Sequence, residues 1–321
     1  MKRDPKSLRI VFMGTPGFAV GPLEMLVKEG YTVAGVVTVP DKPAGRGKQL
    51  NESDVKKFAL ANGLKILQPE KLKAPEFIEE LKALQPDLQV VVAFRMLPEI
   101  VWSLPPLGTF NLHASLLPAY RGAAPINRAI MNGETKTGVT TFFLQQEIDT
   151  GSIVFREELS IGENETAGEL HDRLMIAGTA LVKKTIDAIA EGDCPRIPQS
   201  SLVKTGETLP EAPKIFRDDC RISWSSDAKK VHDHIRGLSP FPTAWTILKK
   251  ENGEEIPLKI FRSEYFSGGT QQQPGEIRNG LEVACGKGFV RVLELQAPGR
   301  KKLPAQEFLR GFPLGNNDRM I

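Results

Sequence analysis

The sequence predicts an α/β fold, with a mostly parallel sheet that has helices on both faces, followed by a small β-barrel. Three observations support this prediction. Short apolar runs alternate with helix-spaced amphipathic segments from residue 8 to residue 192. Residues 193–214 then carry four prolines and no apolar period, which is typical of a linker. Beyond them, turn residues separate strand-like runs at intervals of about 8–15 residues, as in small barrels.

The N-terminal elements follow from hydrophobic periodicity. The apolar run at 8–13 ends at Gly14, and the helix-spaced residues that follow it end at Gly30, where glycine predicts a helix stop. The next elements are strand, helix, strand, helix and strand, predicted at 32–39, 53–62, 64–67, 74–84 and 88–94. This alternation is typical of a Rossmann-like sheet. Residues 41–50, rich in glycine, proline and basic side chains, are predicted to form a polar loop.

The same alternation continues through the middle of the chain. The sequence predicts a strand at 108–113, a helix at 124–132, a strand at 139–145 and a hairpin partner for it at 152–160. Thr166 and Glu169 form a capping-box pattern. This pattern predicts the start of a long amphipathic helix that ends at Gly192.

The C-terminal part is predicted to be a separate domain. We expect an α/β domain at 1–192, a linker at 193–214 and a barrel at 215–321, for which an OB-fold-like barrel is one candidate. One helix at 225–238 precedes the barrel strands, and Trp224, Trp245 and Phe241 are expected in the core. From Arg217 onward there are 17 basic and 13 acidic residues, which hints at an anionic partner, although chance explains so small an excess equally well.

Composition excludes several classes of protein. The hydrophobic content of 40% and the charged content of 25% are those of a folded chain. No apolar run approaches the roughly 20 residues of a membrane helix, and the first residues resemble neither a signal nor a transit peptide. Cys194, Cys220 and Cys285 lie far apart without CxxC spacing, and there are four histidines. We therefore expect free thiols in a reducing cytoplasm and no metal site.

The loop GTPGFAVG at 14–21 resembles a dinucleotide-binding loop only in its place between a strand and a helix. Its glycines are spaced GxxGxxxG rather than GxGxxG, and Pro16 lacks a backbone donor. No acidic residue ends the second predicted strand, where Val39 and Pro40 precede Asp41. These features disfavour NAD binding, while an anion site at the helix N-terminus remains open.

The strongest candidate site lies at the end of the predicted strand 108–113. Asn111 and His113 are two residues apart, so their side chains share one face at the edge where open α/β sheets place their sites. Their spacing alone also fits a structural role, in which both side chains satisfy loop carbonyls. Asp149 follows the next predicted strand, and a strand–helix–strand crossover is expected to return it to the same edge. A carboxylate beside an imidazole favours the charged imidazole and fixes its tautomer.

These three side chains predict a particular chemistry. An amide and a protonated imidazole can donate hydrogen bonds to a developing oxyanion, and the imidazole with its carboxylate can move protons. No serine or cysteine accompanies them as a nucleophile. This absence favours direct transfer between two bound substrates over a covalent intermediate.

Five segments, in order along nearly the whole chain, resemble the folate-dependent formyltransferases: GTPGFAVGPLEML, TVPDKPAGRGKQL, FNLHASLLPAYRGAAPINRAI, GVTTFFLQQEIDTGSI and IRGLSPFPTAW. Asn, His and a distant Asp with an SLLP loop resemble that family in general. The PAGRG loop with a C-terminal barrel resembles its tRNA-directed members. The resemblance implies transfer of the formyl group of 10-formyltetrahydrofolate to the amino group of methionyl initiator tRNA in translation initiation. It implies direct attack through a tetrahedral intermediate.

The resemblance also implies roles for individual residues. Asn111, His113 and Asp149 match the catalytic residues. The residues that match the folate site are Ser115, Leu116, Leu117 and Pro118, together with Phe94, Arg95, Met96 and Leu97 in a segment that departs from many relatives. Arg46 in PAGRG matches an arginine that reaches the tRNA acceptor end, with Lys48 as a second tRNA contact. Arg121 and Gly122 match without an assigned role, no metal is required, and we expect a monomer.

Three alternatives stay open on the sequence. With the same chemistry, the amine could belong to an amino-sugar nucleotide, because sugar formyltransferases can keep the barrel, or to glycinamide ribonucleotide, whose enzymes usually lack it. The chain could instead be a non-catalytic RNA-binding protein whose basic barrel is the working part. A nucleotide-dependent oxidoreductase is the third, and the glycine spacing disfavours it.

Overall fold

Two units of structure alternate along the chain. The structure, a computed structural model, describes residues 2–44, 49–269 and 271–321. Unit 1 comprises Met1–Gly122, Gly138–Leu159 and Asp172–Pro210, and unit 2 comprises Ala123–Thr137, Ser160–His171 and Glu211–Ile321. The predicted domain boundaries at 192 and 215 stay predictions.

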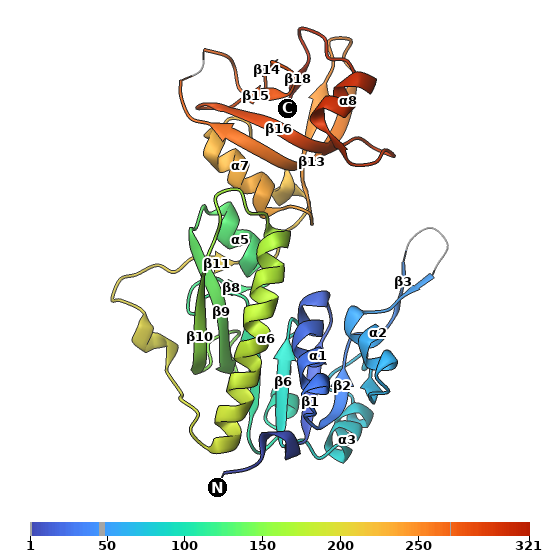
Figure 1. Ribbon diagram of the computed structural model, residues 1–321, viewed down its shortest axis with the longest axis vertical. Helices are drawn as coiled ribbons and strands as arrows, with labels where there is room; N and C mark the ends of the chain where they lie inside the picture. Colours follow the sequence, from blue (N-terminus) through green and yellow to red (C-terminus); the bar gives the residue numbers. More distant parts are fainter. Residues whose placement is uncertain (1, 45–48, 270) are drawn as a thin grey trace. The chain divides into compact units, whose positions relative to one another are not determined.

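Seven strands form the sheet of unit 1, in the order β10-β9-β7-β6-β1-β2-β5. Figure 1 labels β10, β9, β6, β1 and β2 of this sheet. Their bounds are Ile10–Gly14 (β1), Val33–Val37 (β2), Ile66–Leu67 (β5), Leu88–Val92 (β6), Thr109–His113 (β7), Lys136–Phe143 (β9) and Ile153–Ser160 (β10). β1 pairs in parallel with β2 and β6, β2 with β5, and β6 with β7. β9 runs antiparallel to β7. The predicted mostly parallel sheet is confirmed.

Helices cover both faces of this sheet, as predicted. The helices of unit 1 are Val20–Lys28 (α1), Asp54–Ala61 (α2), Pro75–Ala83 (α3), Glu99–Trp102 (α4) and most of Ala167–Glu191 (α6), whereas Pro125–Met131 (α5) belongs to unit 2. On one face, Val11 of β1 shares a buried cluster with Phe77 and Leu81 of α3. On the other face, α6 lies so close that a Cβ at Gly178 would be 2.7 Å from Leu112 of β7.

The predicted capping box is present at the start of α6. Thr166 N and Oγ1 both donate to Glu169 Oε2 at 2.8 Å, and Glu169 N donates to Thr166 Oγ1 at 3.3 Å. Arg262 Nη2 donates to the other carboxylate oxygen of Glu169 at 2.6 Å. The hydrogen bond from the Thr166 backbone, and then the Arg262 contact, lower the pKa of Glu169 to about 2.

A nearly closed antiparallel barrel forms most of unit 2, which confirms the predicted small barrel. Its strands follow the order β14-β15-β16-β13-β12-β18, with β17 beside β16. Their bounds are Ala244–Lys249 (β12), Glu255–Phe266 (β13), Ile277–Arg278 (β14), Glu282–Ala284 (β15), Phe289–Gln296 (β16), Leu303–Pro304 (β17) and Arg319–Met320 (β18). The two ends of the sheet meet where Glu276 bridges Arg319 and Met320 N donates to Gly275 O at 2.8 Å. Helices Ala228–Gly237 (α7) and Ala305–Gly311 (α8) contribute Val231 and Phe308 to the core.

The three aromatic residues expected in the barrel core differ in how far they are buried. Trp224 is buried, with 4% of its surface exposed, as predicted. Trp245 is only half-buried, because β12 alternates and turns Ala244 and Thr246 inward. The prediction for Phe241 is wrong, because this residue lies in the turn before β12 and is 81% exposed.

Short elements account for the other differences from the predicted fold. Lys42–Ala44 (β3) pairs antiparallel with Gln49–Asn51 (β4), so a ladder flanks the centre of the predicted loop 41–50. The remaining short pieces are Arg121–Gly122 (β8), Glu211–Ala212 (β11) and 3-10 turns at Pro5–Ser7, Gly17–Ala19, Gln199–Leu202 and Asp218–Cys220. They are shorter than the window in which periodicity is measurable. Within the described ranges, no helix is long and apolar enough to cross a membrane.

Candidate active site

β7 places Asn111 and His113 on the same face of the sheet. In the register between β6 and β7, Val91 lies opposite Asn111. Val91 belongs to the buried cluster that contains Phe77 of α3 and Val101 of α4. Because side chains alternate along a strand, Asn111 and His113 therefore face the side of the sheet that α3 and α4 cover.

The imidazole of His113 is held by one hydrogen bond and faces one carboxylate. The side chain is 7% exposed, and its Nε2 lies 2.8 Å from the carbonyl oxygen of Tyr120. A carbonyl oxygen can only accept, so Nε2 carries the hydrogen and Nδ1 is the free nitrogen of the neutral ring. Nδ1 lies 3.8 Å from Asp149 Oδ2. The proton that His113 gains or loses is therefore the one at Nδ1.

The carbonyl oxygen of the Asn111 amide is uncommitted. Its Oδ1 is buried and has no hydrogen-bond partner within the described part of the chain. A buried acceptor left without a partner costs about 1–3 kcal/mol, so the strand holds this amide at some expense of stability. Such unsatisfied groups are common at sites built for a ligand rather than for the fold.

Asp149 reaches His113 as predicted, but by a different path. The expected crossover places the next strand parallel to β7, whereas β9 is antiparallel and ends with Phe143 opposite Phe110, at the start of β7. Residues 144–152 then lead back, and Asp149 adopts a left-handed backbone with φ 53°. Its side chain is 13% exposed, and Oδ2 accepts a hydrogen bond from Gly122 N at 3.1 Å.

A residue that sequence reasoning missed contacts the Asp149 loop. Gln199, only 3% exposed, donates from Nε2 to Asp149 O at 2.7 Å and to Gly151 O at 2.9 Å. Its Oε1 accepts from Arg121 Nε at 3.1 Å and Nη2 at 2.6 Å. Gln199 lies in the predicted linker, where a lone glutamine among prolines carries no periodic signal.

The SLLP loop, predicted to contact folate, is tied to β9 by its backbone. Thr140 Oγ1 donates to Ser115 O at 2.6 Å and accepts from Leu117 N at 3.1 Å. The Leu117 side chain is fully buried with Phe142 and Ile153. These contacts give Ser115 and Leu117 a structural role in shaping the loop. Pro118 is also buried, and Leu116 is half-buried.

The other predicted folate segment lines a pocket of about 620 Å³ in unit 1. The lining residues are Leu72, Lys73, Arg95, Met96, Leu97, Pro98, Glu99, Ile100, Trp102 and Gln146. Arg95 fixes this wall, because its guanidinium donates to the carbonyl oxygens of Glu70, at 2.9 Å, and Pro69. Phe94 instead packs against the cluster under α3. The volume and the mixed apolar and polar lining suit a small organic ligand.

The described residues include neither of the predicted tRNA contacts. Arg46 and Lys48 lie outside the described residues. Among the residues that are described, no group of three or more His, Cys, Asp or Glu side chains could hold a metal ion. The three cysteines are free, as predicted.

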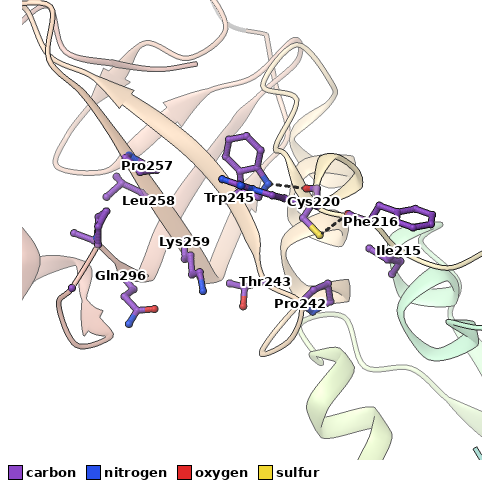
Figure 2. A pocket seen from close by; sticks show the side chains of 14 residues that line it. Ile215, Phe216, Cys220, Pro242, Thr243, Trp245, Pro257, Leu258, Lys259 and Gln296 are labelled. Carbon is purple, nitrogen blue, oxygen red and sulfur yellow. Dashed lines mark hydrogen bonds between the residues drawn. The ribbon is translucent and has the colours of Figure 1, made fainter. Parts of the chain in front are cut away.

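A second pocket lies in unit 2 and contains none of the predicted site residues (Figure 2). It has a volume of about 600 Å³ and includes Phe216, Thr243, Trp245 and Lys259 in its lining. Trp245 Nε1 donates to the carbonyl oxygen of Arg217 at 2.9 Å, which fixes the indole at its edge. The half-buried position of Trp245 is thus that of a pocket wall.

Comparisons with known proteins identify the family of the chain. The profile described as "Formyl transferase" matches residues 8–186, and "Formyl transferase, C-terminal domain" matches residues 214–313. The methionyl-tRNA formyltransferases of Bacteroides fragilis and Flavobacterium johnsoniae are 54% and 46% identical over 98% of this chain, and over 97% and 99% of their own. A solved sugar 3N-formyl transferase has a TM-score of 0.63 at 20% identity, over 92% of this chain and 99% of its own. HypX from Aquifex aeolicus, solved with tetrahydrofolic acid, has a TM-score of 0.62 at 19% identity, over 98% and 50%. The chain therefore belongs to the formyl transferase family and groups within it with the methionyl-tRNA formyltransferases.

Proposed function

We propose that the chain transfers the formyl group of 10-formyltetrahydrofolate to the amino group of methionyl initiator tRNA. The observation that carries the proposal is the full-length match, at 46–54% identity, to curated methionyl-tRNA formyltransferases. The site supports it, because the amide of Asn111 shares a face of β7 with His113, whose imidazole lies 3.8 Å from the Asp149 carboxylate.

Asn111 serves as the donor for the developing oxyanion. Attack of a neutral amine on a formyl carbon places negative charge on the formyl oxygen. The Nδ2 group of Asn111 carries two N–H donors and can supply a hydrogen bond to that oxygen. One such donor is typically worth about 3–4 kcal/mol of transition-state stabilisation.

His113 and Asp149 handle the proton. Because Nε2 is used by the Tyr120 carbonyl, Nδ1 is the atom that takes a proton from the attacking amine or returns one to the leaving nitrogen. Asp149 Oδ2, 3.8 Å away, stabilises the charged ring. The gap exceeds a hydrogen bond, so Asp149 acts on the ring through its charge. If His113 also donates a hydrogen bond to the oxyanion, the donor is Nδ1 in its protonated form, because Nε2 is already bonded to Tyr120 O.

The two substrates use different parts of the chain. The formyl donor occupies the pocket lined by Arg95, Met96 and Leu97. Arg46 and Lys48 contact the acceptor end of the tRNA, and the barrel at 215–321 contacts its backbone through basic side chains. The enzyme works in the cytoplasm as a monomer.

The test is one formylation assay with two tRNAs. Purified protein receives 10-formyltetrahydrofolate and either charged initiator tRNA or a charged elongator tRNA, and formyl-methionine is measured. Formylation of the initiator alone is expected. Formylation of an amino-sugar nucleotide in a parallel reaction, with neither tRNA modified, would overturn the proposal.

A further inference from the structure

We propose that Gln199 is a positioning residue that holds Asp149 in place beside His113. The inference rests on the proposed function, in which Asp149 stabilises the charged imidazole. Nothing in the chemistry of the reaction calls for Gln199, because it does not touch the reacting groups.

Every hydrogen-bonding position of the Gln199 side chain is occupied. A primary amide offers two N–H donors and two acceptor lone pairs. Both donors go to the loop that carries Asp149, one to the carbonyl of Asp149 itself and one to Gly151 O. Both acceptor positions are taken by Arg121. A buried amide with all partners made has one orientation, so it acts as a rigid spacer between Arg121 and the loop.

The resulting network grips Asp149 at two points. Gln199 holds its main-chain carbonyl, and Gly122 N holds its carboxylate oxygen Oδ2 at 3.1 Å. Arg121, which binds Gln199, and Gly122, which binds the carboxylate, are consecutive, so one short segment supports both hydrogen bonds to Asp149. Arg121 and Gly122, which match the family without an assigned role, acquire one here. Two anchor points fix the direction in which the carboxylate faces Nδ1 of His113.

Gln199 is itself held firmly. Ile197, two residues earlier, pairs with Ile153 at the start of β10 through hydrogen bonds of 2.8 and 2.9 Å. Leu202, three residues later, packs against the cluster of Leu117 and Phe142. The proline-rich segment is therefore anchored to unit 1 on both sides of Gln199, and the amide can transmit that position to the loop.

A purely structural role is the competing explanation, in which Gln199 only fastens the segment to unit 1. The two explanations differ in whether the effect of changing Gln199 depends on the residue at position 149. A fastening residue affects stability whatever stands at position 149, whereas a positioning residue affects turnover only while Asp149 is there to be positioned.

The experiment is a double-mutant cycle with purified full-length variants. Gln199→Glu keeps the acceptors for Arg121 and removes both donors to the loop, and Gln199→Met removes both sets of bonds. Each is expected to lower kcat about 10- to 100-fold, the usual effect of a misplacement of about 1 Å, with KM for the formyl donor unchanged. In the Asp149→Asn background, Gln199→Met is expected to lower kcat no further. Gln89→Met, which alters another buried glutamine of unit 1, is the matched control and should keep the wild-type kcat.

A second measurement does not depend on activity. Hydrogen exchange at the Gly122 amide reports its bond to Asp149 and should accelerate about tenfold in Gln199→Met but not in Gln89→Met. Unchanged kcat in both Gln199 variants, or an equal further loss in the Asp149→Asn background, overturns the inference. If the wild type formylates no acceptor, the proposed function fails, and the exchange result alone decides whether Gln199 holds Asp149.

Discussion

Replacing Asn111 by leucine should lower turnover and raise the free energy of unfolding. Leucine has the same branching at Cγ and keeps the strand, but it is larger and removes the amide at the end of β7. Loss of one oxyanion donor lowers kcat about 10²–10³-fold. The same change removes Oδ1, a buried acceptor without a partner among the described residues. Its full desolvation penalty is about 1–3 kcal/mol, and because the residue is only half-buried we expect a gain near the lower limit, about 1 kcal/mol.

Two measurements on the same preparation check this prediction. Turnover is measured with saturating 10-formyltetrahydrofolate and charged initiator tRNA, and the free energy of unfolding is measured by urea titration. Gln89→Met is the control, because Gln89 also has a buried side-chain atom without a partner, Nε2, near the start of β6. Its turnover should stay at the wild-type value. A turnover of Asn111→Leu within threefold of wild type would falsify the assignment of the oxyanion donor.

Four other changes test the site and the fold. Asp149→Asn should lower kcat by orders of magnitude with an unchanged circular dichroism spectrum, and a near-normal rate would refute its role. Gly151→Ala should abolish activity and destabilise its loop, because the new Cβ would lie 1.6 Å from Phe143 O; a fully active variant would contradict the loop geometry. Glu169, with its pKa lowered to about 2, stabilises the fold above its ordinary pKa of 4.5 and loses this contribution as pH falls towards 2, so Glu169→Gln should reduce the melting temperature at pH 7 and make little difference at pH 2. Arg46→Ala should raise the KM for tRNA and weaken its salt dependence, and an unchanged KM would exclude the contact.

The regular elements were predictable because their signals are local. The apolar alternation gave the strands and helices of unit 1, and the capping box at Thr166 and Glu169 is complete within four residues. The direction of β9 was not predictable, because pairing with β7 is settled by contacts across the sheet. The prediction that His113 and Asp149 lie close together is therefore confirmed, but the parallel crossover from which it was argued is wrong.

The residues that support the site could not be predicted from the sequence for a related reason. Gln199 is 50 positions from Asp149 and carries no pattern of its own, so only the folded chain shows that the two meet. Phe241 illustrates the reverse error. An aromatic residue between two prolines looks like core by composition, but the turn before β12 leaves it exposed.

The left-handed backbone at Asp149 also limits which acid can occupy that position. Residues with φ near 53° are mostly glycine, asparagine and aspartate, whose short side chains tolerate this conformation. Glutamate would supply the same charge, but its longer side chain gains no such tolerance and would carry the carboxylate past the Gly122 amide. The preference for aspartate at this site is therefore set by the main chain as well as by proton chemistry. Asparagine is the substitution that removes the charge without straining the left-handed backbone.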